Sequence, residues 1–287
     1  MKNYAAIMFD VVESRKYYER YEVQNVLMKC VDYLNNLYQD KIKKKVISSA
    51  GDEFQGLFFD LQSAFSYIRK LQILIYPIRI RCGIGYGEIK YDVEEWLSSA
   101  LDGEAYYLAR DAIVSISRKK SNMICFNTKS KYDKYLNVLY LSNMQLKSRQ
   151  TQAAHLIELI ADVMLPIDGE NDRKREEQRF YEFLLENRYR LIEQEYWNKL
   201  GGRHRDIERT NIDYELLFES TEKYFLNKNT ESLFYMDEYW AYGMSTEIAR
   251  IMNTTRQNVD RYISLGRIKE SRTTDKAIFE LLGEDIW

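Results

Sequence analysis

The chain has 287 residues, of which 45% are hydrophobic and 30% charged, and its formal net charge is −2. This length allows two domains with separate cores, and the balanced charge argues against a protein that binds polyanions with its whole surface. Two histidines and three isolated cysteines argue against a Ser–His–Asp triad, a histidine zinc site and a disulfide framework. Any bound metal is therefore expected to be Mg²⁺ or Mn²⁺, held by oxygen ligands.

No apolar run reaches the roughly 18–20 residues needed to cross a bilayer. The chain runs directly into its first predicted strand, so we expect no signal peptide. With its isolated cysteines, the sequence predicts a cytoplasmic protein without a membrane partner.

The first part of the chain predicts an α+β domain, because its apolar residues alternate in some segments and follow helical spacing in others. The expected elements are a strand at 5–9, a helix at 17–39, a hairpin of strands at 46–48 and 54–59, a helix from 61 that Pro77 ends, a strand at 78–86, a helix at 103–117 and a strand at 123–126. Asp60 is the expected N-cap of the helix before Pro77. The β-α-β-β-α-β order predicts a ferredoxin-like palm.

From about residue 143 the strand pattern disappears, which predicts an all-α region. The expected elements are helices at 153–164, 180–200 and 211–226, with an exposed charged linker at 168–178 and with Gly201-Gly202 ending the middle helix. We divide the chain accordingly into a palm domain at 1–142, a helical linker or insertion at 143–235 and a helix-turn-helix domain at 236–287.

Two short segments, 246–253 and 256–265, predict the two helices of the helix-turn-helix. Thr254 and Gln257 fit a capping box at the start of the second helix, and Gly266 ends that helix. The expected buried positions are Ile248, Met252, Val259 and Tyr262. Paired short helices also occur in proteins that bind no DNA, which is the alternative interpretation.

The second of these helices begins with polar and basic residues suited to DNA. Gln257 and Asn258 could read base edges in a major groove. Arg256 and Arg261 are expected to contact phosphates. The sequence therefore predicts double-stranded DNA as a partner of the C-terminal domain.

Asp10 and Asp52 are the candidate metal ligands. Asp10 follows the first strand and Asp52 lies in the hairpin turn, so the palm topology predicts that they are neighbours. Two carboxylates there would repel each other unless a cation or a proton lay between them, which favours a divalent metal held against a nucleotide. The backbone amides at Val12, Ser14 and Arg15 precede a helix and are expected to hold phosphate oxygens. Alternatively, Asp10 is a helix cap or a solvated loop residue.

The strand after Pro77 carries alternating glycines at 83, 85 and 87. This run lacks the lysine of a P-loop and does not precede a helix. We expect another backbone or a base to pack closely there. Arg79 and Arg81 precede the run, either as solvated charges or as contacts to a triphosphate or a dimer partner.

Three motifs carry a resemblance to a known family. The stretches SAGDEFQGL at 49–57, RCGIGYGE at 81–88 and DGEAYYLARDAI at 102–113 together resemble the SatD family of bacterial proteins. Residues 50–54 also look like the GGDEF motif of diguanylate cyclases, with Ala50 in place of the first glycine. The strand ending in Asp10 and the 81–88 run are similar to class III nucleotide cyclases.

The resemblance to cyclases implies roles by position. Asp10 and Asp52 would hold Mg²⁺ or Mn²⁺, with the Val11 carbonyl as a further ligand. Glu53 would contribute to metal binding or act as the catalytic base.

The same resemblance implies nucleotide contacts. Gly51 lies in the turn that the nucleotide would approach. Arg110 falls where GGDEF cyclases place a phosphate-binding lysine, and a guanidinium also matches phosphate oxygens. Tyr107 stands where class III cyclases have a catalytic asparagine.

Three functional hypotheses follow. The first is a cytoplasmic regulator in which a nucleotide with Mg²⁺ or Mn²⁺ binds the palm and alters the DNA affinity of the helix-turn-helix. The second is an enzyme, either a nucleotidyl cyclase or an oligonucleotide synthetase, that makes a signalling nucleotide from a nucleoside triphosphate. The third is a palm that serves only as a dimerisation scaffold. The resemblance to palm cyclases also implies a homodimer.

Overall fold

The computed structural model describes residues 2–17, 19–90, 103–118, 123–170, 178–200, 210–225 and 239–287. The chain forms two compact units. Unit 1 comprises residues 1–144 and 278–287, and unit 2 comprises residues 145–277. The predicted charged linker lies largely, and Gly201-Gly202 lies wholly, outside the described residues. The three-part division of the sequence stays a prediction.

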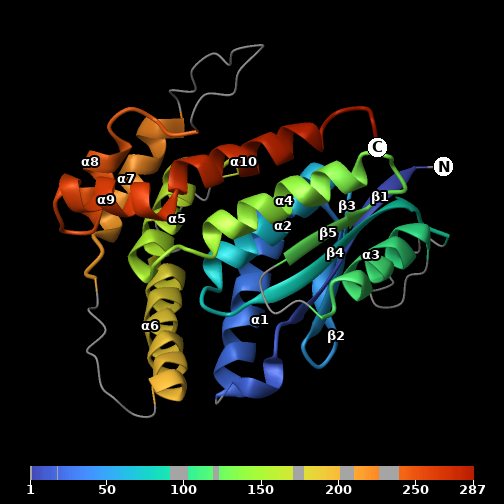
Figure 1. The fold of residues 1–287 in the computed structure, drawn as a ribbon, viewed down its shortest axis with the longest axis horizontal. Helices are drawn as coiled ribbons and strands as arrows, with labels where there is room; N and C mark the ends of the chain where they lie inside the picture. The colour runs from blue at the N-terminus through green and yellow to red at the C-terminus, as the bar shows by residue number, and fades with distance from the viewer. Residues whose placement is uncertain are drawn as a thin grey trace. The chain divides into compact units, whose positions relative to one another are not determined.

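Unit 1 is built on a five-stranded sheet with the strand order β2-β3-β1-β4-β5 (Figure 1). Its elements are β1 (Asn3–Val11), α1 (Arg20–Leu37), β2 (Ile42–Ala50), β3 (Glu53–Phe58), α2 (Leu61–Leu74), β4 (Ile80–Glu88), α3 (Glu104–Ser115), β5 (Met123–Asn127) and α4 (Asp133–Lys147). β1 lies between β3 and β4 and is antiparallel to both, while β5 runs parallel to β4. The predicted β-α-β-β-α-β order is confirmed as a mixed α+β arrangement.

Helices cover both faces of this sheet. Phe58 of β3 contacts Tyr67 of α2, with ring centroids 5.2 Å apart. The preceding residue, Leu57, belongs instead to a buried cluster with Tyr106 and Ala109 of α3. Because successive side chains of a strand point to opposite faces, α2 and α3 lie on opposite sides of β3.

The expected helix cap at residue 60 is confirmed. The Asp60 carboxylate accepts a hydrogen bond of 2.7 Å from the Ser63 amide at the start of α2. This side chain satisfies one of the amides that the first turn of a helix leaves without a partner.

Unit 2 is helical in its described residues. Its elements are α5 (Gln152–Met164), α6 (Gln178–Leu200), α7 (Tyr214–Phe225), α8 (Met244–Ile251), α9 (Arg256–Gly266) and most of α10 (Ile268–Leu281). α5 packs against α7, α8 and α9. The helices expected at 153–164, 180–200 and 211–226 are confirmed, with ends that differ by at most three residues.

Two details of the α8–α9 pair differ from the prediction. The N-cap of α9 is Thr255 and not Thr254, because the Thr255 side chain accepts a hydrogen bond from the Asn258 amide. The second buried position of α9 is Ile263 and not Tyr262, which is only partly buried. The α-helical period places Ile263, four residues after Val259, on the inner face.

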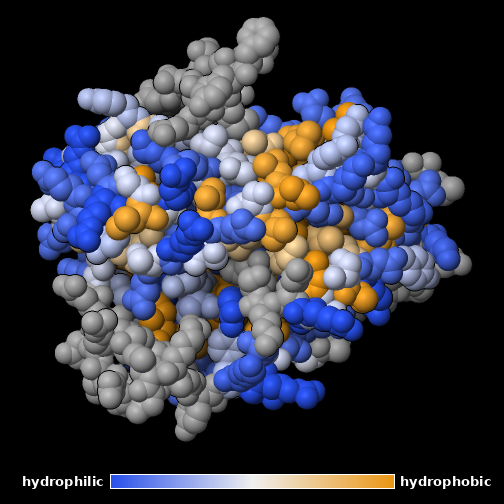
Figure 2. All heavy atoms as spheres, in the orientation of Figure 1, coloured by the Kyte–Doolittle hydropathy of each residue, from blue (hydrophilic) through white to orange (hydrophobic). Residues whose placement is uncertain are grey.

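The sequence did not predict α4 or α10, because neither has a clean apolar stripe. α4 exposes large apolar residues at Tyr135, Val138 and Leu141. Figure 2 shows that hydrophobic residues lie among hydrophilic ones on the visible surface of the molecule. α10 instead buries polar residues, including Arg272 and Asp275. None of the described helices is long and apolar enough to span a bilayer.

Candidate functional site

The strand register places three charged residues in one row across the sheet. Asp10 of β1 lies opposite Glu53 of β3 on one side and opposite Arg81 of β4 on the other. Side chains at directly opposed positions share a face of the sheet. Asp52 precedes Glu53 in the hairpin turn, so the predicted neighbourhood of Asp10 and the acidic turn is present.

Asp10 and Arg81 form a bidentate ion pair. Arg81 Nε donates to Asp10 Oδ1 and Nη2 donates to Oδ2, both at 2.9 Å. The remaining terminal nitrogen, Nη1, donates to the Ser117 carbonyl. The two side chains are only 16% and 29% exposed, so interpreting Arg81 as a solvated charge is wrong. Sequence reasoning missed this pair, because it depends on the register between β1 and β4.

The surroundings of Asp10 raise the pKa of its carboxyl group. Burial is the largest cause, and the charge of Asp52 acts in the same direction. The hydrogen bonds and positive charge of Arg81 oppose both effects. Asp52 is therefore close enough to Asp10 for the two charges to interact, and Arg81 is the cation that compensates Asp10 in this arrangement.

The hairpin turn depends on Gly51, whose φ of +61° is strained for residues with a side chain. The two preceding serines support the turn: Ser48 Oγ donates to the Gly51 carbonyl at 3.4 Å and Ser49 Oγ donates to the Glu53 carbonyl at 3.3 Å. A Cβ built on Gly51 would have no atom within 4 Å. The open space beside Gly51 is compatible with a ligand approaching the backbone.

The segment after Asp10 differs from the expected phosphate cradle. Val11 and Val12 are buried, and the Val12 amide donates to the Arg79 carbonyl at 2.8 Å. Only a short 3-10 turn at Ser14–Lys16 follows, since α1 begins at Arg20. The amides expected at Val12, Ser14 and Arg15 therefore do not form the N-terminus of an α-helix, and a phosphate would have to break the Val12 bond to use that amide.

Glycines in β4 allow α3 to lie directly on the sheet. A Cβ at Gly83 would come within 2.0 Å of the Ala109 carbonyl oxygen, and one at Gly85 within 2.2 Å of the Ala105 carbonyl oxygen. The prediction that a backbone packs closely on these glycines is confirmed. α3 thereby covers the same sheet face that carries the row of charges.

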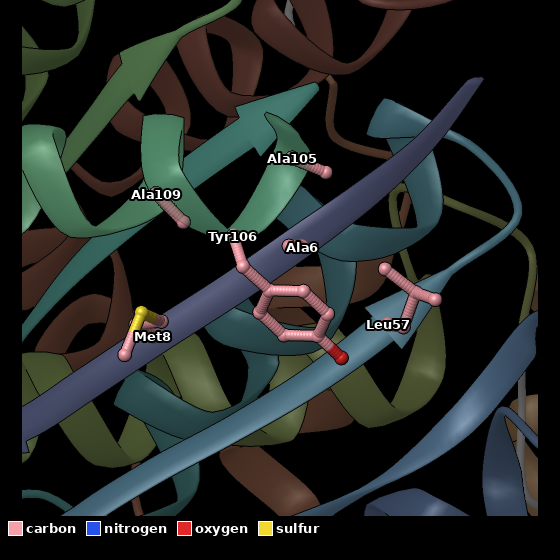
Figure 3. Packing of buried hydrophobic residues seen from close by; sticks show 6 residues of the cluster. All are labelled: Ala6, Met8, Leu57, Ala105, Tyr106 and Ala109. Atoms are coloured by element: carbon pink, nitrogen blue, oxygen red, sulfur yellow. The ribbon is translucent and has the colours of Figure 1, made fainter. Parts of the chain in front are cut away.

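Tyr106 extends from α3 across β1 toward β3, between Met8 and Leu57 (Figure 3). Arg110 follows Tyr106 by four residues and therefore lies on the same side of the helix, one turn closer to its C-terminal end. The Ser117 carbonyl that binds Arg81 lies just beyond that end. Arg110 is exposed.

The donor set fits a hard divalent cation only in part. Among the described residues, no group of three or more His, Cys, Asp and Glu side chains gathers as a metal site. Asp10, Asp52 and the Val11 carbonyl would supply oxygen ligands of the type that Mg²⁺ and Mn²⁺ prefer. Mg²⁺ commonly keeps several waters and needs only one or two carboxylates, so a sparse set of protein ligands suits it.

In unit 2, the residues predicted to contact DNA share the surface of α9. Arg256, Gln257, Asn258 and Arg261 are all exposed. The opposite face of α9 is buried through Val259 and Ile263. Arg256 makes an exposed ion pair of 3.3 Å with Asp260, the kind of pair that water and salt screen readily.

Comparison with known proteins gives a family match and distant likenesses among solved structures. Among curated proteins, nothing matches. One solved structure similar to this chain is described as a bacterial light-regulated adenylyl cyclase. That likeness has 13% identity and a TM-score of 0.33 and covers 47% of this chain and 44% of the other; it is too weak to carry an argument. The family model of the SatD family matches residues 4–176, more than half of the chain. The chain belongs to the SatD family.

Proposed function

We propose that this SatD-family protein is a cytoplasmic regulator whose palm binds a nucleotide together with Mg²⁺ or Mn²⁺. The observation that carries the proposal is the row of Arg81, Asp10 and Glu53 beside Asp52. Carboxylates that a cation can bridge lie here next to a guanidinium that can bind phosphate.

In this proposal, Asp10, Asp52 and the Val11 carbonyl bind the cation, which neutralises phosphate charge when bound. The open backbone at Gly51 admits the nucleotide. Arg110, exposed on α3, contacts its phosphates.

The experiment is a thermal unfolding assay with each nucleoside triphosphate and Mn²⁺. Wild-type protein should be stabilised by at least one nucleotide in the presence of the metal, and Asp52→Asn should lose that stabilisation. Asp60→Asn is a matched acidic control, since Asp60 caps α2. Absence of stabilisation by every nucleotide would contradict the proposal and leave the scaffold hypothesis.

A second candidate function is nucleotidyl transfer, and the position of Glu53 opposite Asp10 favours it. Glu53 would take the proton of a ribose 3′-hydroxyl as that oxygen attacks an α-phosphate. The bond from the α-phosphorus to the bridging oxygen breaks, and pyrophosphate leaves. If the wild-type protein releases pyrophosphate and the Glu53→Gln and Asp52→Asn variants do not, the protein is an enzyme. If the wild-type protein binds nucleotide but releases no pyrophosphate, the result supports the regulator.

We also propose that α8 and α9 act as a helix-turn-helix that binds double-stranded DNA, with the protein acting as a homodimer. The exposure of Arg256, Gln257 and Arg261 along α9 supports this proposal. Selection from a random DNA library should yield a bound sequence. Gln257→Ala should relax its specificity, while Arg261→Ala should weaken binding to all sequences. Failure of the wild-type protein to retain any DNA would contradict it.

A further inference from the structure

We propose that Arg81 controls the access of the cation to Asp10, so that the cation and the nucleotide phosphate bind this site in a mutually dependent way. This inference rests on the proposed nucleotide and metal site and adds its regulation. Arg81 would hold Asp10 until a phosphate offers the guanidinium an alternative partner.

The first step is competition for the same oxygens. Arg81 engages both carboxylate oxygens of Asp10, each at 2.9 Å. A divalent cation bound to Asp10 would be repelled by the positive charge of the Arg81 guanidinium. Because the site is partly buried, water would screen this repulsion poorly. The Arg81 pair and coordination of a cation by Asp10 therefore compete with each other.

The second step is the alternative partner of Arg81. A guanidinium fork matches two phosphate oxygens as well as two carboxylate oxygens. The Ser117 carbonyl holds Nη1 of Arg81 at the end of α3, which leaves Nε and Nη2 to change partner without moving the side chain far. Phosphate binding to these two nitrogens would release Asp10.

The consequence is positive coupling. When Mn²⁺ binds alone, it must separate Asp10 from Arg81, and Arg81 gains no new partner. When a metal-free nucleotide binds, its phosphate takes Arg81, and Asp10 gains no new partner. When both bind, each of the separated partners gains an opposite charge, and by linkage each ligand raises the affinity for the other. The pair thereby selects a ligand that brings both a cation and a phosphate.

The experiment measures the two ligands separately on the full-length protein. Free Mn²⁺ is followed by electron paramagnetic resonance. The α,β-methylene triphosphates of adenosine and guanosine are followed by equilibrium dialysis in EDTA. Arg81→Gln should bind Mn²⁺ alone about tenfold more tightly than wild type, and Asp10→Asn should bind the metal-free nucleotide about tenfold more tightly, factors that correspond to the loss of one charge-assisted interaction.

Two further variants separate this mechanism from a general change of charge. Arg79→Gln removes an equal charge two residues away, where Arg79 lies 3.7 Å from Glu13, and should leave both affinities within about twofold. Arg81→Lys keeps the charge but cannot form both bonds, so it should fall between wild type and Arg81→Gln. It also provides a folded comparison if the glutamine variant is unstable.

The outcomes are distinguishable. If wild type binds Mn²⁺ with nucleotide but Arg81→Gln binds Mn²⁺ alone no better than wild type, the coupling is overturned and the proposed site stands. An equal gain in Arg79→Gln also overturns it, because bulk charge would then be the cause. If no protein binds either ligand, both proposals fail.

Discussion

Arg81 and Asp10 face each other from neighbouring strands and share two hydrogen bonds of 2.9 Å. The pair lies next to Glu53 and Asp52, where the carboxylates would otherwise repel each other. Its position gives Arg81 two roles that can be measured separately, one in stability and one in ligand binding.

The contribution of the pair to stability follows from its burial and geometry. A double-mutant cycle of Asp10→Asn and Arg81→Gln, measured by urea unfolding, should give a coupling free energy of about 1–3 kcal/mol, typical of hydrogen bonds between charged groups. In the matched pair of Glu13 and Arg79, the closest charged atoms are 3.7 Å apart and the arginine side chain is 40% exposed, against 16% for Arg81. This pair should give less than about 1 kcal/mol. Equal couplings for the two pairs would contradict this assignment.

The glycines of β4 and of the hairpin turn should respond differently to alanine. Gly85→Ala would drive a Cβ within 2.2 Å of a carbonyl oxygen of α3, so it should lower the free energy of unfolding by about 3 kcal/mol or more. Gly51→Ala meets no atom within 4 Å but requires a φ of +61°, and should lower it by about 1–2 kcal/mol. Chemical denaturation of both variants checks the ranking, and the reverse order would show that α3 does not pack on β4 as described.

His155 should make unit 2 sensitive to acid. Burial lowers its pKa from 6.5 to about 3; the charge of Glu158 opposes this effect, while those of Arg188 and Lys147 reinforce it. Between these values the folded protein binds fewer protons than the unfolded chain, so its stability falls as the pH drops below about 6.5.

His155→Gln removes this contribution. The loss of unfolding free energy between pH 6.5 and pH 5 should be about 1–2 kcal/mol smaller in the variant than in wild type, since one proton is worth about 1.4 kcal/mol per pH unit. Urea unfolding at the two pH values measures it. Identical losses in both proteins would show that His155 is not held neutral by the fold.

The start of α9 offers a test of the cap. Thr255→Ala should destabilise unit 2 by about 1 kcal/mol, because the Thr255 side chain accepts from the Asn258 amide. Thr254→Ala removes a neighbouring hydroxyl that only receives an exposed bond of 3.3 Å from the Asn258 side chain, and should change stability by less than about 0.5 kcal/mol. A larger loss of stability in Thr254→Ala than in Thr255→Ala would instead support the capping box that the sequence predicts at Thr254 and Gln257.

The sequence predicted most strands and helices of the α+β unit well because alternation and helical spacing are local signals. The strand ending in Asp10 and the hairpin around Gly51 need only a few neighbouring residues to be recognised. α4 and α10 were missed because one exposes Val138 and Leu141 and the other buries Arg272 and Asp275. Both invert the usual relation between polarity and burial.

The sequence predicted the acidic residues of the candidate site but not the Arg81 guanidinium that pairs with Asp10. That Asp10 lies beside the hairpin turn follows from topology. That Arg81 pairs with Asp10 depends on the register of β1 and β4, which a one-residue slip would alter. The bond from the Val12 amide to the Arg79 carbonyl is likewise a tertiary contact, invisible in the sequence around Asp10.

The most direct test of the central proposal is an anomalous-scattering map from crystals grown with Mn²⁺ and an α,β-methylene nucleoside triphosphate. A cation bound as proposed should give a peak about 2.0–2.2 Å from carboxylate oxygens of Asp10 and Asp52, as oxygen ligands of small divalent cations lie. Arg81 should then contact a phosphate. A Mn²⁺ peak away from both carboxylates, with the Arg81–Asp10 pair intact beside bound nucleotide, would contradict the account.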